Sequence, residues 1–175
     1  MTGTKLATAI AGSLLLLLPA RGAEMLRIAM TASDIPTATG VPNNGYEGFR
    51  FLGFPIFEGL VLWDLSRADR PADLRPGLAE RYEQAADDKR TWIFHLRHSV
   101  KFHDGTDFNA DVVIWNFDRV LKNDSPQFDP AAFALSRGRI ATLVSYRKID
   151  DFTVALTTRE PLSYVPWFRP ERGWN

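Results

Sequence analysis

Hydrophobic and polar residues alternate over residues 91–97, which is the clearest two-residue period in the chain. Trp92, Phe94 and Leu96 fall on one face, and the positions between them fall on the other. Alternation of this kind predicts a half-buried β-strand. Residues 78–84 lead into this strand through the polar stretch 87–90, so the sequence predicts a β-hairpin at this point.

A helical period follows a predicted turn. The turn is His103-Asp104-Gly105-Thr106, because an Asp-Gly pair supplies a residue that tolerates positive φ. Asn109 is the expected N-cap of the next helix, and Asp111 places negative charge in its first turn. Apolar residues then recur at i, i+4, i+7 and i+8, which predicts one buried stripe made of Val113, Phe117, Val120 and Leu121.

Shorter patterns predict the remaining elements. An apolar face formed by Phe49, Leu52, Ile56 and Leu60 predicts a helix that begins near Tyr46 and that Pro55 either kinks or divides into two short helices. Apolar runs predict strands at 26–31, 61–64, 140–149 and 152–158, the last two joined at Asp150-Asp151. Charged residues and prolines predict a surface loop over 66–75, a polar linker over 122–130 and a single helical turn over 131–136. The predicted fold class is therefore mixed α/β, with β-hairpins and a few short helices.

Several of these segments, in this order, resemble the signature region of family 5 extracellular solute-binding proteins. The resembling stretches are FEGLV at 57–61, PGLAERYE at 76–83, FHLRHSVKFHDGT at 94–106 with the helix after it, and IDDFTVALTTREP at 149–161. The family comprises the dipeptide, oligopeptide and nickel receptors of ABC importers. The resemblance implies the amino-terminal part of lobe I of a two-lobed periplasmic binding protein. Members of the family often carry glycine in the hairpin turn, where this chain has Lys89 or Arg90.

The amino terminus has the organisation of an export signal. Lys5 precedes the apolar stretch Leu6–Leu18, and Ala20 and Gly22 are small residues at −3 and −1 of a cut before Ala23. We therefore expect a secretory signal peptide over 1–22 and a partial solute-binding domain, without its second lobe, over 23–175. An uncleaved anchor or a buried helix is the alternative, and the shortness of the stretch disfavours a membrane-spanning helix. Without a lipid-accepting cysteine, a soluble periplasmic protein is expected.

Composition narrows the classes of partner. The chain has 21 basic and 21 acidic residues, so it lacks the basic footprint of a nucleic-acid or membrane-surface protein. It has no cysteine, which excludes disulfides and thiolate metal sites. We expect a monomeric receptor without cofactors. The resemblance implies a peptide or other small solute as ligand and the membrane subunits of an ABC importer as partners.

The best ligand-contact candidates surround the predicted loop that precedes the Tyr46 helix. Glu47 can meet the amine of a peptide, and Arg50 can bind a carboxylate through its planar fork. Alternatively, the two asparagines only cap the helix and Glu47 is only its first-turn acid. The resemblance implies that the aspartate anchoring a peptide's amino terminus lies in the second lobe, so no residue here takes that role. The full candidate set is Thr31, Asn43, Asn44, Tyr46, Glu47 and Arg50.

Two other functional interpretations remain open. One is a secreted hydrolase or metal-dependent enzyme built on His103 and Asp104, although the chain contains neither GxSxG nor HExxH. The other is a truncated fragment without function.

Simpler structural roles are expected for the remaining suggestive residues. His95 and His98 should lie on opposite faces of a strand, and His103 should hydrogen-bond its turn. Trp92 and Trp115 should lie in the core. Asp104, Asp107 and Asp111 lack the spacing of a calcium loop.

Overall fold

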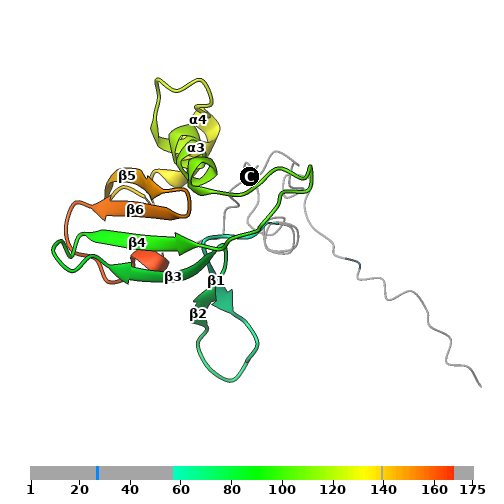
Figure 1. Cartoon of the computed structure of the whole chain (residues 1–175). Coiled ribbons are helices and arrows are strands. Elements are labelled where there is room, and N and C mark those ends of the chain that lie inside the picture. Colours follow the sequence, from blue (N-terminus) through cyan, green and yellow to red (C-terminus); the bar gives the residue numbers. More distant parts are fainter. Residues whose placement is uncertain (1–26, 28–56, 139, 168–175) are drawn as a thin grey trace, which may run out of the picture.

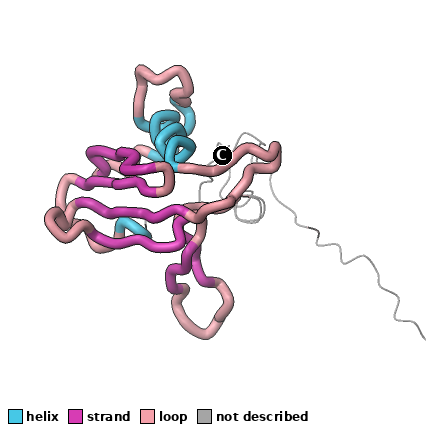
Figure 2. Tube along the Cα trace, in the orientation of Figure 1, coloured by secondary structure: helices cyan, strands magenta, loops and turns pink. Residues whose placement is uncertain are grey.

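The computed structural model describes residues 27, 57–138 and 140–167. Figures 1 and 2 show the two α-helices stacked beside one part of a four-stranded sheet, with a smaller two-stranded ribbon projecting away from it. In chain order the elements are β1 (Val61–Asp64), β2 (Asp73–Pro76), β3 (Ala79–Gln84), β4 (Thr91–Leu96), α3 (Ala110–Leu121), α4 (Pro130–Ser136), β5 (Leu143–Asp150), β6 (Thr153–Thr158) and the 3-10 helix η3 (Val165–Trp167). The predicted mixed α/β class with hairpins and short helices is confirmed.

The main sheet is antiparallel and has the strand order β3-β4-β6-β5. Both predicted hairpins are present, and β6 pairs with β4 on one side and β5 on the other. As a central strand, β6 is buried on both faces, including Thr153 and Ala155 on the face opposite Val154 and Leu156. The predicted strand over 140–149 begins later, at Leu143, because the Leu143 amide donates to the Ile140 carbonyl and closes a turn there.

Helix α3 covers the sheet with the predicted apolar stripe. The Asn109 side chain accepts a hydrogen bond from the Val112 amide at 3.2 Å, which confirms the N-cap. Val113 and Phe117 are buried in the core, Phe117 stacks on Tyr146 at a ring-centroid distance of 4.9 Å, and Leu121 packs against the core from its edge. Val120 at the end of the stripe is half-buried.

One of the two predicted core tryptophans is in the core. Trp92 packs against the buried cluster, and its indole Nε1 donates to the Leu162 carbonyl at 2.9 Å. The prediction for Trp115 was wrong, because this residue is 44% exposed. Two residues correspond to about 200° of helical rotation, so Trp115 faces away from the sheet that buries Val113.

The predicted surface loop over 66–75 is shorter in the structure. Residues 73–76 form strand β2, which pairs antiparallel with β1 in the register Val61↔Pro76 to Asp64↔Asp73. Its side chains are mostly exposed, so β2 lacks the hydrophobic alternation by which a strand is recognised in sequence. Backbone pairing with β1 is what makes this polar segment a strand.

The linker after α3 ends in a capped helix of two turns rather than the predicted single turn. Asp129 caps α4 by accepting hydrogen bonds from the amides of Ala131 and Ala132. The same carboxylate pairs with Arg119 of α3 at 3.2 Å, and both side chains are mostly buried. One residue therefore caps α4 and ties it to α3.

Among the described residues, no helix has the length and apolar character required to cross a membrane.

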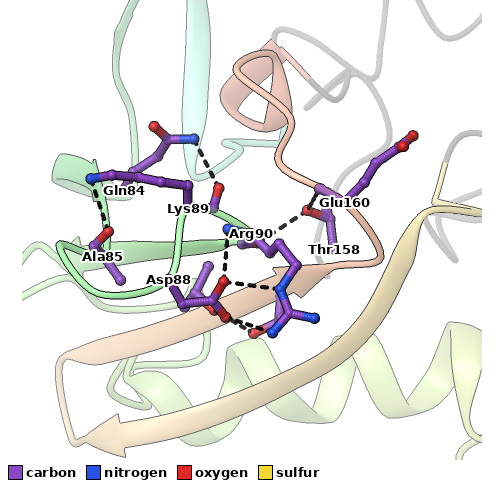
Figure 3. A network of polar contacts seen from close by, with 9 residues as sticks. Gln84, Ala85, Asp88, Lys89, Arg90, Thr158 and Glu160 are labelled. Carbon is purple, nitrogen blue, oxygen red and sulfur yellow. Dashed lines mark hydrogen bonds and ion pairs between the residues drawn. The ribbon is translucent and has the colours of Figure 1, made fainter.

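The β3–β4 turn is closed by Asp88 (Figure 3). Its carboxylate accepts from the Arg90 amide, from the Arg90 guanidinium and from the Thr91 hydroxyl. The hydrogen bonds from Arg90 come first among the causes that lower the pKa of Asp88 to about 2. This carboxylate network closes a turn that contains Lys89 and Arg90 and no glycine.

Asp88→Asn should therefore change how stability depends on pH. The folded pKa of Asp88 lies below its usual value of 3.8, so the carboxylate stabilises the fold above pH 3.8 and loses this contribution as the pH falls toward 2. We expect the variant to melt at a lower temperature than the wild type near neutral pH. The difference should narrow between pH 4 and 2 in thermal scans followed by circular dichroism. A constant difference across this range would contradict the assigned role.

Thr158 is fully buried, and its hydroxyl bridges two backbone carbonyls, as Figure 3 shows. Its Oγ1 lies 3.0 Å from the Arg90 carbonyl and 2.7 Å from the Glu160 carbonyl. Thr158→Val keeps the shape and removes the donor, so we expect a loss of about 1–2 kcal/mol in the free energy of unfolding. Thr142→Val is a matched control, because the buried Thr142 hydroxyl has no hydrogen-bond partner within the described part of the chain and its removal should be neutral or stabilising. Urea denaturation of both variants measures the contrast.

Candidate functional site

All six predicted ligand-contact residues lie outside the described residues. These are Thr31, Asn43, Asn44, Tyr46, Glu47 and Arg50. The predicted strand at 26–31, apart from Arg27, and the predicted Tyr46 helix as far as residue 56 also lie outside them. They remain predictions, and the described structure begins again at Phe57, seven residues after Arg50.

The chain enters the sheet at a backbone crossing formed by residues 58–60 and 77–79. The Gly59 carbonyl accepts from the Leu78 amide at 2.8 Å, and the Leu60 carbonyl accepts from the amides of Gly77 and Ala79. A Cβ atom on Gly77 would lie 2.3 Å from the Gly59 carbonyl oxygen, so only glycine permits this approach. The crossing thus holds residues 59 and 60 against the start of β3.

An ion pair joins the same segment to the end of β4. The Arg97 guanidinium donates through Nη2 to Glu58 Oε2 at 2.9 Å, and the Arg97 amide donates to the Leu78 carbonyl. Arg97 Nε is buried and has no hydrogen-bond partner among the described residues. Sequence reasoning missed this arrangement, although Glu58 stood out as the one charged residue within the apolar stretch Phe57–Val61.

The predicted turn at 103–106 is confirmed, and its side chains serve the turn. Gly105 has φ +89°, and its amide donates to the Phe102 carbonyl at 2.9 Å. Asp104 Oδ1 accepts from both the amide and the hydroxyl of Thr106, and this hydrogen bonding lowers the pKa of the Asp104 carboxyl. The prediction that His103 hydrogen-bonds the turn was wrong, because the contacts between Asp104 and Thr106 hold the turn instead. All four residues are exposed, and the ionised Asp104 already has its partners.

The three histidines have separate local contacts. His95 Nε2 lies 3.0 Å from Glu83 Oε1 across the β3–β4 hairpin, and this bond is the largest cause lowering the pKa of Glu83. The ring of His98 packs on Phe152 at a centroid distance of 3.9 Å. His103 lies in the exposed turn described above. His95 and His98 thus have separate contacts, and within the described residues the three rings do not form a shared metal site.

Two of the three aspartates considered for calcium form ion pairs, and the third, Asp104, holds its turn. Asp107 pairs with Lys101 at 2.6 Å, and Asp111 pairs with Lys148 at 2.8 Å. Lys148 also contacts Asp151 at 2.6 Å, so it links α3 to the β5–β6 turn. Within 57–138 and 140–167, no group of three or more histidine, aspartate or glutamate side chains is placed to hold a metal ion.

Comparison of the sequence with protein families gives a match over most of the described region. Residues 73–170 match the profile of the bacterial extracellular solute-binding proteins, family 5. The oligopeptide-binding protein OppA of Salmonella typhimurium is 30% identical over 167 residues, covering 78% of this chain and 29% of the relative. The dipeptide-binding protein of Escherichia coli K12 is 32% identical over 117 residues, covering 61% of this chain and 21% of the relative. The chain thus spans less than a third of the length of these relatives.

Solved structures show the same arrangement of elements. The periplasmic binding protein MoaA of A. tumefaciens R10, solved with mannopinic acid, has a TM-score of 0.60 and 25% identity, covering 77% of this chain and 25% of that protein. AgaA of the same organism, solved with agropinic acid, has a TM-score of 0.57 and 29% identity, covering 73% of this chain and 23% of that protein. The fold therefore matches part of a much larger binding protein, in agreement with a partial lobe.

Proposed function

We propose that this chain, which belongs to the bacterial extracellular solute-binding proteins of family 5, serves as the substrate-binding component of an ABC importer. The observation that carries the proposal is the family match over residues 73–170, supported by the shared fold of the described elements. The ligand class we propose is peptides, because the relatives similar to the chain include oligopeptide- and dipeptide-binding proteins.

In this proposal the protein captures a solute and performs no catalytic step. Binding shifts a two-lobed receptor toward its closed form, and the importer supplies the energy of transport. Residues 23–175 would belong to the first lobe. Two features of the described region support a structural rather than catalytic role for the HDGT turn: its exposure and the engagement of Asp104 by Thr106.

Ligand contact is proposed for the six residues of the predicted loop and helix start. Glu47 would meet a peptide amine and Arg50 a carboxylate, since charge-assisted hydrogen bonds are the strong ones at such a site. The remaining four would satisfy backbone groups of the ligand. None of these contacts involves a cofactor.

Calorimetry of the full-length gene product with di- and oligopeptides tests the function. We expect peptide binding by the wild type, and weaker binding by Glu47→Gln and Arg50→Lys. His103→Ala should leave binding unchanged. If the protein binds no peptide but binds agropinic or mannopinic acid, with which the two A. tumefaciens proteins were solved, the ligand class changes and the receptor function is kept. If the wild type hydrolyses the titrated peptide and the His103→Ala variant does not, the result would instead support the enzyme alternative.

Export is the second part of the proposal. Cleavage after Gly22 should release a mature protein that begins at Ala23, with 21 − 2 = 19 basic and 21 acidic residues. Amino-terminal sequencing of the protein from the periplasmic fraction measures this directly. An intact Met1 on a protein retained in the membrane would contradict it.

A further inference from the structure

We infer that the Asp104–Gly105 peptide is a latent site of backbone isomerisation, and that the hydrogen bonds of its own turn slow the reaction. Isomerisation converts an ordinary aspartate into isoaspartate, in which the backbone runs through the side-chain carboxyl carbon. An Asp-Gly pair favours it, because glycine has no side chain to hinder the approach of its amide nitrogen. The sequence contains one such pair, in the HDGT turn. The inference does not depend on the proposed receptor function.

The covalent steps need no reactant other than water. The Gly105 nitrogen attacks Cγ of the protonated Asp104 carboxyl, and the carboxyl hydroxyl leaves as water with the amide proton. Water then adds to the main-chain carbonyl carbon of Asp104 in the resulting cyclic imide, and the bond from that carbon to the Gly105 nitrogen breaks. One water molecule is released and one is consumed, and no atom is oxidised or reduced.

Steric crowding does not prevent this reaction in the folded protein. Asp104 and Gly105 are both exposed. Apart from the chain neighbours of Gly105, no heavy atom of the described residues lies within 4 Å of a Cβ built at that position. Protection of the peptide must therefore come from the hydrogen bonds of the turn.

Those hydrogen bonds engage both reacting groups. Asp104 Oδ1 accepts from the Thr106 amide at 2.9 Å and from the Thr106 hydroxyl at 2.7 Å. The Gly105 amide donates to the Phe102 carbonyl at 2.9 Å, and the Phe102 amide donates to the Thr106 carbonyl at 2.9 Å. Ring closure requires the Asp104 side chain and the 104–105 peptide to rotate toward each other. The reaction therefore waits for local opening of the turn.

Thr106 also keeps the carboxyl in its unreactive form. The hydrogen bond from the Thr106 hydroxyl is the largest cause that lowers the pKa of Asp104, and the bond from the Thr106 amide comes next. An ionised carboxylate resists attack by a nucleophile and has no hydroxyl to release. Thr106 thus opposes isomerisation through the position of the carboxylate and through its charge.

Isomerisation would disturb the entry to helix α3. It lengthens the backbone of the turn by one methylene group. The segments on either side of the turn are joined by the hydrogen bond from the Phe108 amide to the Val100 carbonyl and by the bridge between Lys101 and Asp107. Asn109, the N-cap of α3, follows directly. A longer turn would therefore strain the contacts that place the start of the helix.

Ageing of the purified protein at neutral pH tests the inference. Trypsin releases residues 102–119, because Lys101 precedes this peptide and Arg119 ends it. Chromatography separates its aspartate and isoaspartate forms, which have equal mass, and fragmentation in the mass spectrometer locates the change. We expect isoaspartate at Asp104 to form about tenfold more slowly in the folded wild type than in wild type unfolded by guanidinium chloride. Equal rates, or no isoaspartate in the unfolded chain, would overturn the inference.

Two substitutions of Thr106 isolate the role of its hydroxyl. Thr106→Val keeps the branched shape and removes the donor, so isomerisation in the folded variant should be about fivefold faster than in the folded wild type. Thr106→Ser keeps the donor and should age at the wild-type rate. Circular dichroism checks that both variants are folded, and in guanidinium chloride all three proteins should react alike. A folded Thr106→Val variant that ages like the wild type would refute the protective role of the hydroxyl, and the wild-type comparison holds whether or not that variant folds.

Discussion

Phe117→Ala should lower the free energy of unfolding by about 3–5 kcal/mol. Phe117 is 4% exposed, lies on the buried face of α3 and stacks on Tyr146 of β5. Removal of the ring opens a cavity between helix and sheet and also removes the aromatic contact. The loss should be visible as a shift of the urea midpoint without a change in slope.

Trp115→Ala is the control for this prediction. It removes a larger ring from the same helix, but Trp115 is 44% exposed and faces away from the sheet. We expect a smaller effect than that of Phe117→Ala, because truncation of a side chain that is partly in water leaves no closed cavity. Equal losses in the two variants would mean that α3 packs through both faces.

Gly77→Ala should destabilise the fold by about 3 kcal/mol, because the added methyl group overpacks a backbone crossing. The new Cβ would lie 2.3 Å from the Gly59 carbonyl oxygen, and backbone is unable to move aside as a flexible side chain can. The residues 59 and 60 must then separate from 77–79, with loss of their hydrogen bonds. Thermal and urea denaturation both measure the effect.

Gly138→Ala makes the same chemical change where space is open. Apart from the chain neighbours of Gly138, no heavy atom of the described residues lies within 4 Å of a Cβ at this position. The substitution should be neutral or slightly stabilising, by up to about 1 kcal/mol, since alanine reduces the freedom of the unfolded chain. A comparable loss at both glycines would show that the Gly77 effect is not caused by the crossing.

The candidate site shows a limit of sequence reasoning. Side chains suited to ligand contact could be proposed from residue type and from the predicted loop, but all six lie outside the described residues. The Glu58–Arg97 pair was not predicted, because its members are separated by 39 positions and meet only when β1, β3 and β4 converge. Single-sequence patterns report neighbours along a strand or helix, not partners at such a distance.

Local patterns by themselves determined the β3–β4 and β5–β6 hairpins, the HDGT turn and the capped helix α3. In each case the signal is contained within a few residues: a two-residue period, an Asp-Gly pair or an N-cap before an apolar stripe. The resemblance carried by these same segments led to the family, which the comparison over residues 73–170 confirmed.

Only the tertiary structure decided which predicted faces are buried and which polar segments pair. Strand β2 exists because its backbone completes β1, although its side chains are mostly exposed. Both faces of β6 are buried because it lies between β4 and β5, and Trp115 is exposed because the sheet meets the opposite side of α3. These outcomes depend on contacts between segments far apart in the chain, and such contacts leave no periodic trace in the residues that make them.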